Sequence, residues 1–267
     1  MNPTPSVLTL WLTFWFAILG SVTGSFLACL VSRRQAKESI GRGRSHCTVC
    51  GNILTFRDLI PIVSYLTHKG RCRFCKSLIP IECLLAELAG AIIFVGTFLY
   101  FGLSWNSIMW LIAGTLLLFI SLEDGAKRII LDQSLILLVI NRLLFLFFFQ
   151  RPIQNKLPSL LGGVLVIPGA MLILTLIMDK IMKKETMGGG DIKLMAVMGL
   201  YLNWKQMFLM IFASCIFGLG WIAGKRIWKK GSKKEDSAIP FGPFLSMGCF
   251  VVSWFGEPII QWYINLF

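Results

Sequence analysis

Long apolar stretches alternate with short polar segments along most of the 267 residues. A helix that crosses the hydrocarbon core of a bilayer needs about 20 apolar residues. Eight stretches approach this length, and the sixth of them is the shortest; they cover residues 8–30, 81–101, 107–122, 129–149, 158–178, 191–203, 206–224 and 239–264. The pattern therefore predicts an all-α polytopic membrane protein with about eight transmembrane helices.

Composition and flanking charges agree with this class. Hydrophobic residues make up 56% of the chain and charged residues 15%, and the mean hydropathy is +0.74. No positive residue precedes the first apolar stretch, whereas Arg33 and Arg34 follow it. This arrangement predicts a first helix that is retained rather than cleaved as a secretory signal, with its N-terminus outside the cytoplasm.

The net charge of +13 is distributed as in a membrane protein. Eight spans would place four polar segments on one side, namely 31–80, 123–128, 179–190 and 225–238. Together with Lys193 at the start of the sixth span, these segments hold 22 of the 26 lysines and arginines. Because cytoplasmic loops concentrate positive charge, these segments are predicted to be cytoplasmic. A nucleic-acid surface would instead interleave aromatic and basic residues on one folded domain, so the predicted partner is a lipid bilayer and not a nucleic acid.

The segment 31–80 carries two Cys-x2-Cys pairs, Cys47/Cys50 and Cys72/Cys75, with 21 residues between them. Four thiolates in two tight turns are typical of a closed, structural zinc site. Two disulfides are the alternative, but the ten basic residues of this segment favour the cytosol, where thiols stay reduced. We therefore predict a zinc site with four cysteine ligands. The predicted divisions are a first transmembrane helix (1–30), a cytosolic zinc-binding loop (31–80) and a transmembrane core (81–267).

Acidic residues are rare, and two of them stand at the predicted cytoplasmic border of the membrane. Asp124 closes the third apolar stretch, and Asp191 follows Gly188, Gly189 and Gly190 at the start of the sixth. Two carboxylates in one partly dry site share a proton, so one can take a proton from water while the other donates to a carbonyl oxygen. Helix capping and interfacial exposure are the plainer alternative, and proton-coupled transport is a third.

The chain closely resembles the bacterial type IV prepilin peptidases, which are GxGD-type aspartic proteases. The resemblance rests on an ordered series of motifs: "GSFLACLVSRR" at 24–34, the two cysteine pairs, Glu87 in "AELAG", "EDGAKRIILD", "GGGDIK", and "IPFGPFLSMG" at 239–248.

The resemblance implies catalytic roles for Asp124 and Asp191. It implies supporting motif roles for a further set of residues: Gly188, Gly190, Lys193, Asp132 and Glu87. The expected reaction is cleavage of a prepilin or pseudopilin leader after a glycine, at the cytoplasmic side of the bacterial inner membrane. In many members, N-methylation of the new terminus with S-adenosylmethionine follows.

Several positions depart from the family pattern. Ala28 replaces the usual Asn, Glu82-Cys83-Leu84 replace an Arg-Tyr-Pro segment, and Leu131 replaces the Pro before Asp132. The aspartate pair is intact, so the departures bear on methyl transfer. A peptidase without methyltransferase activity, an inactive pilin-binding scaffold and a proton-coupled transporter remain alternatives, and the residues that would hold the methyl donor are not predicted.

Overall fold

The computed structural model describes residues 6–39, 43–149, 157–184, 186–228 and 240–266. Within these residues the chain is helical, with no strand and only two isolated β-bridges in the cysteine-bearing segment. The chain forms two compact units, Met1–Leu122 and Glu123–Phe267. The tail of the fourth basic segment, residues 229–238, lies outside the described residues.

The predicted membrane class is confirmed. Among the described residues, seven helices are long and apolar enough to cross a bilayer. The sixth apolar stretch differs from the prediction, because its helix α7 (Gly189–Met198) has only 10 residues. At 1.5 Å per residue it extends about 15 Å, half the thickness of a hydrocarbon core. The structure therefore has seven candidate spans where about eight were expected.

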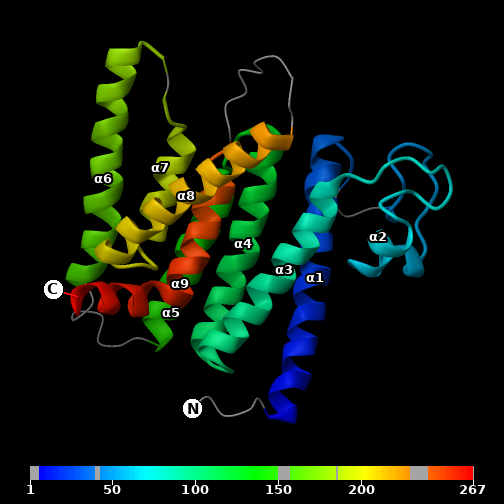
Figure 1. The fold of residues 1–267 in the computed structure, drawn as a ribbon, viewed down its shortest axis with the longest axis horizontal. Helices are drawn as coiled ribbons and strands as arrows, with labels where there is room; N and C mark the ends of the chain where they lie inside the picture. The colour runs from blue at the N-terminus through cyan, green and yellow to red at the C-terminus, as the bar shows by residue number, and fades with distance from the viewer. Residues whose placement is uncertain (1–5, 40–42, 150–156, 185, 229–239, 267) are drawn as a thin grey trace. The chain divides into compact units, whose positions relative to one another are not determined.

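The first unit is built on α1 (Val7–Gln35) and α3 (Ile81–Phe101), which run side by side in Figure 1. Glycines bring their backbones together: a Cβ at Gly20 would collide with the carbonyl of Gly90, and one at Gly24 with that of Ala86. Small residues at such contacts are the usual means of close helix packing in membranes.

Two further parts complete the first unit. The segment between α1 and α3 carries a 3₁₀ turn, η1 (Phe56–Leu59), and a short helix, α2 (Val63–Thr67). Helix α4 (Trp105–Lys127) follows α3, and its last residues belong to the second unit.

In the second unit, α7 packs against several longer helices. These are α5 (Asp132–Phe149), α6 (Leu157–Met182) and α9 (Gly242–Ile264), and α8 (Trp204–Trp228) packs on α6 and α9. The approach of α6 is close, since a Cβ at Gly163 would lie 2.5 Å from the carbonyl oxygen of Gly199. The short helix is thus held inside the unit.

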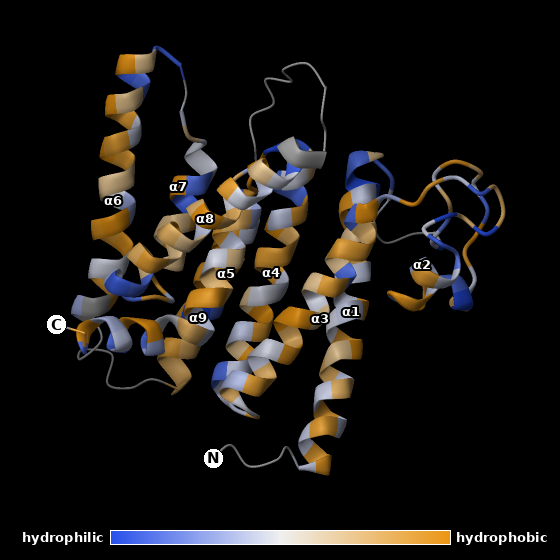
Figure 2. Cartoon of the chain, in the orientation of Figure 1, coloured by the Kyte–Doolittle hydropathy of each residue, from blue (hydrophilic) through white to orange (hydrophobic). Residues whose placement is uncertain are grey.

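Hydrophobic colour follows the long helices in Figure 2. Many large apolar side chains on their outer faces are exposed, among them Ile173, Leu176 and Leu219. A soluble protein rarely exposes so much contiguous apolar surface, whereas helices in lipid must.

Candidate active site and metal centre

Asp124 is a buried carboxylate near the end of α4, with 5% of its surface exposed. Its Oδ2 accepts a hydrogen bond of 2.9 Å from the backbone N–H of Gly242, the first residue of α9. A Cβ at position 242 would lie 2.8 Å from the same oxygen, so only glycine permits this approach. Sequence reasoning did not assign this contact, although the motif at 239–248 was a signal.

Asp191 lies in the first turn of α7, and its backbone N–H donates to the carbonyl of the N-cap residue Gly188. The three glycines differ in what surrounds them. A Cβ at Gly190 would lie 3.1 Å from Cβ of Ile130, whereas one at Gly189 would have no neighbour within 4 Å. Packing against Ile130 is therefore what position 190 requires.

The second unit brings the two aspartates within electrostatic reach of each other. Burial, and then the charge of Asp124, raise the pKa of Asp191 to about 7, against an ordinary value of 3.8. Asp191 belongs to α7, which is not one of the candidate spans. Burial and the charge of Asp124 therefore both favour the protonated form of Asp191.

Lys193 and Asp132 pair with each other. The lysine Nζ lies 2.8 Å from Oδ1 of Asp132, and the two side chains are 60% and 67% exposed. The bond joins the N-terminal halves of α7 and α5. An exposed ion pair of this kind contributes about 0–1 kcal/mol, so it steadies α7 without dominating its position.

A buried polar cluster secures the other end of α7. Arg142 on α5 is 7% exposed, and its Nε donates to the carbonyl of Leu200 at 2.8 Å. The hydroxyl of Tyr201 donates to the carbonyl of Leu138 at 2.7 Å and accepts from the side-chain amide of Asn141 at 3.0 Å. The sequence pattern did not predict this cluster, although Arg142 is a charge inside an apolar stretch and such charges often mark function.

Glu87 belongs to the first unit, on α3, and is 8% exposed. Its Oε2 accepts a hydrogen bond of 2.6 Å from the backbone N–H of Ile62, which precedes α2. Ile62 has φ +63°, a conformation that a β-branched residue rarely adopts. The acid is therefore tied to a strained point of the loop.

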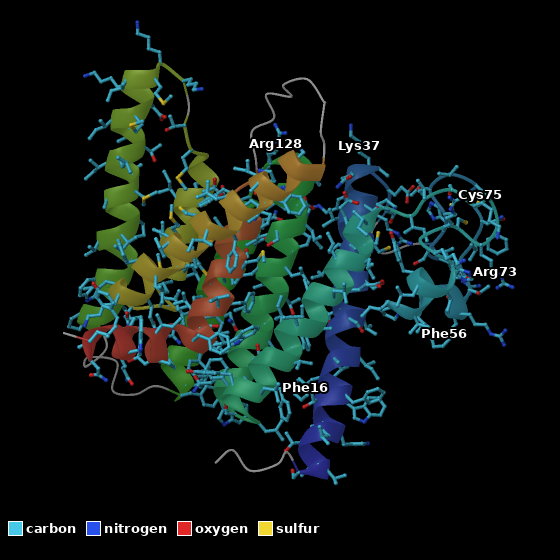
Figure 3. The ribbon with its side chains drawn as sticks, viewed as in Figure 1. Phe16, Lys37, Phe56, Arg73, Cys75 and Arg128 are labelled. Carbon is cyan, nitrogen blue, oxygen red and sulfur yellow. The ribbon has the colours of Figure 1, made fainter. Side chains whose placement is uncertain are left out.

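The four predicted metal ligands converge in the same loop. Their Sγ atoms all lie within 4.8 Å of one another, and Cys75 is labelled in Figure 3; the ligands are Cys47, Cys50, Cys72 and Cys75. Matching turns present the two pairs, with N–H bonds from Gly51 to the carbonyl of Cys47 and from Lys76 to that of Cys72. Both donors have positive φ, 71° and 60°.

The thiols are free, so the disulfide alternative is not what the structure forms. Backbone N–H groups of Cys50 and Val49 lower the pKa of Cys47 to about 6, which favours the metal-binding thiolate. The cluster can hold a metal ion through four sulfur ligands. His46 and His68 lie outside it and face Glu38 and Asp58 instead.

Fold and site together define a multi-pass membrane protein with paired carboxylates and a four-thiol loop. Residues 111–223 match the type IV leader peptidase family, and residues 18–101 match the bacterial peptidase A24 N-terminal domain. The chain belongs to the type IV leader peptidase family.

Curated relatives bear the name prepilin leader peptidase/N-methyltransferase. One from Legionella pneumophila is 30% identical over 236 residues, covering 87% of this chain and 79% of the relative. One from Bacillus subtilis is 29% identical over 249 residues, covering 93% and 96%. One from Aeromonas salmonicida is 29% identical over 227 residues, covering 83% and 75%. No solved structure matches the chain.

Proposed function

We propose that this chain is a membrane aspartic endopeptidase that removes the leader peptide of prepilins or pseudopilins. Family membership and the names of the relatives support the reaction class. The observation that carries the proposal for the site is the electrostatic coupling of Asp191 to Asp124 in a partly buried setting. A pair of carboxylates that shares one proton supplies both the general base and the general acid for amide hydrolysis.

The two acids take different roles. Burial and the nearby charge of Asp124 raise the pKa of Asp191, so we assign the shared proton to Asp191. In this scheme the Asp124 carboxylate accepts a proton from the attacking water, and protonated Asp191 donates to the scissile carbonyl oxygen. Collapse of the resulting tetrahedral species breaks the C–N bond and returns a proton to the leaving amine. The N–H of Gly242 fixes the orientation of Asp124 throughout.

The site is proposed to face the cytoplasm at the bacterial inner membrane. Basic residues adjoin both acids in sequence: Lys127 and Arg128 follow Asp124, and Lys183 and Lys184 precede Asp191. Positive charge marks the cytoplasmic ends of membrane helices. A leader cleaved after a glycine, just before an apolar pilin helix, would reach the acids from this side.

Substitution of single carboxyl groups tests the proposal. Asp124→Asn and Asp191→Asn each remove a titratable group while keeping its size, and each is expected to abolish processing of co-expressed prepilin on a gel. Asp132→Asn is the matched control. Because its ion pair with Lys193 is exposed, the expected loss is at most about fivefold. Normal processing by either Asp124→Asn or Asp191→Asn would show that this pair is not the catalytic one.

A second activity, N-methylation of the new pilin terminus, is favoured by the relatives' names and by a cavity in the first unit. S-adenosylmethionine supplies an electrophilic methyl group on a cationic sulfur. Mass spectrometry of the mature pilin terminus made by this chain alone tests the activity: a methylated amine is expected, and an unmodified one would assign the chain as a peptidase only.

For the cysteine cluster we propose a structural zinc ion. Four sulfur ligands in two matching turns suit tetrahedral coordination, and with all four positions filled by protein no place is left for substrate.

A further inference from the structure

The segment between α1 and α3 presents an exposed apolar face on η1 and α2, which contact each other. Phe56 is 82% exposed, Val63 52% and Leu66 63%. Leu59 and Ile60, between the two elements, are exposed as well. Contiguous apolar side chains of this size mark a surface that contacts a partner or a membrane.

The fold sets the depth of this face along the membrane helices. The backbone N–H of Ile62, which precedes α2, donates to Oε2 of Glu87 at 2.6 Å. Glu87 is the seventh residue of α3 and therefore lies about 9 Å along the helix from its first residue. In Figure 3, Phe56 lies at a level between Lys37 and Phe16 of α1. The start of α2 is thus level with the body of the membrane helices and not with their ends.

This depth corresponds to the boundary between lipid headgroups and acyl chains. Helix α3 has 21 residues and extends about 32 Å, close to the thickness of a hydrocarbon core, so its first residue stands near the edge of the core. Segments that lie in the membrane interface bury their apolar face about 5–10 Å into this boundary. The membrane helices also expose apolar side chains at this level, since Phe26 of α1 is 63% exposed and Leu85 of α3 49%.

Basic residues border the apolar face. Arg57 in η1 and Lys69, two residues after α2, are both exposed. Residues 40–80 contain seven lysines and arginines and one acid, Asp58. A zinc ion with four thiolate ligands carries a net charge of about −2, which leaves the segment positive. Phosphate groups of anionic lipids are the complementary partner of such a surface.

We propose that η1 and α2 form an interfacial anchor that attaches the cysteine-bearing loop to anionic lipid. Phe56, Val63 and Leu66 enter the acyl boundary, while Arg57 and Lys69 bind lipid phosphates. With the orientation proposed above, this is the cytoplasmic leaflet. The loop is then held to the membrane at a third point besides α1 and α3.

Photo-cross-linking tests the location in the purified full-length protein, held in nanodiscs of phosphatidylglycerol and phosphatidylcholine. Phe56→p-benzoylphenylalanine is compared with Phe74→p-benzoylphenylalanine. Phe74 is 48% exposed and precedes Cys75, which Figure 3 places nearer to the level of Lys37 than Phe56 is. Mass spectrometry should find at least about fivefold more lipid adduct at position 56, because only the inserted face reaches acyl chains.

Other occupants of the face would appear in the same experiment. Equal lipid capture at positions 56 and 74, or none at position 56, would overturn the proposal. Cross-links from position 56 to added prepilin or to a second copy of the chain, in place of lipid, would assign the face to that partner and overturn it as well.

Hydrogen exchange of the amides in 56–67 tests the role of charge. In nanodiscs with phosphatidylglycerol, the double variant Arg57→Gln/Lys69→Gln should exchange about 25-fold faster than the wild type, at about fivefold for each cation removed from an anionic surface. In pure phosphatidylcholine the same variant should differ from the wild type by less than about twofold. Lys183→Gln/Lys184→Gln removes the same charge from the second unit and should exchange as the wild type does.

Thermal unfolding checks that each variant is folded. Unchanged exchange in Arg57→Gln/Lys69→Gln, or an equal acceleration in pure phosphatidylcholine, would refute the binding of lipid phosphates.

Discussion

Adding one methyl group at each of three glycines tests how closely the backbone must approach the aspartate pair. At Gly242 the new Cβ would lie 2.8 Å from Oδ2 of Asp124, at Gly190 it would lie 3.1 Å from Ile130, and at Gly189 it would meet nothing within 4 Å. The buried bond from Gly242 to Asp124 is worth about 1.5–3 kcal/mol. Gly242→Ala should therefore lower kcat by roughly 10- to 100-fold.

The other two substitutions should lower kcat less, because the added Cβ has more room at each of them. Gly190→Ala requires Ile130 to shift by a few tenths of an ångström and should cost a few-fold in kcat, by the sensitivity of rates to small misplacements. Gly189→Ala should stay within about twofold, as surface changes do. Initial rates on purified prepilin in nanodiscs give kcat, and thermal unfolding checks folding. Wild-type kcat in Gly242→Ala, or an equal loss in Gly189→Ala, would refute the reasoning.

Three further predictions concern the metal, the α7 anchor and pH. Cys47→Ser should lose bound zinc in metal analysis yet keep prepilin cleavage, and an intact wild-type protein without zinc would contradict the cluster's role. Tyr201→Phe removes the bond to Leu138 and should lower the free energy of unfolding by about 1 kcal/mol, measured by denaturation; an unchanged stability would count against the anchor. Because the pKa of Asp191 is raised to about 7, the rate of cleavage should decline above that pH. The free energy of unfolding should also fall as the pH rises from about 4 to 7, because the folded protein holds a proton that the unfolded chain has lost. Asp191→Asn should remove this pH dependence of the free energy of unfolding.

The apolar pattern predicted the helices well but misjudged the sixth. Hydropathy stays high through Leu200 and Leu202, yet α7 ends at Met198 and the chain turns there. The close approach of Gly199 to Gly163 of α6 accommodates this turn. A hydropathy average cannot distinguish a buried apolar turn from a helix, because it counts residue type and not backbone conformation.

Partners distant in the chain were beyond the sequence pattern. The two cysteine pairs could be predicted, because their spacing dictates a tight turn and a shared ion. In contrast, the bond between Asp124 and Gly242 joins residues 118 positions apart, and only the tertiary fold of the second unit brings them together. The sequence showed that Asp124 and Asp191 are acidic residues at the ends of apolar stretches, and the resemblance to a family implied their catalytic roles.

The central claim is that Asp124 and Asp191 act as one unit that shares a proton. Measuring kcat for Asp124→Asn, Asp191→Asn and the double variant on one prepilin tests it most directly. Groups that act as a unit are strongly non-additive, so each single variant should lose as much activity as the double variant. Losses that simply multiply, or wild-type cleavage by either single variant, would contradict the account.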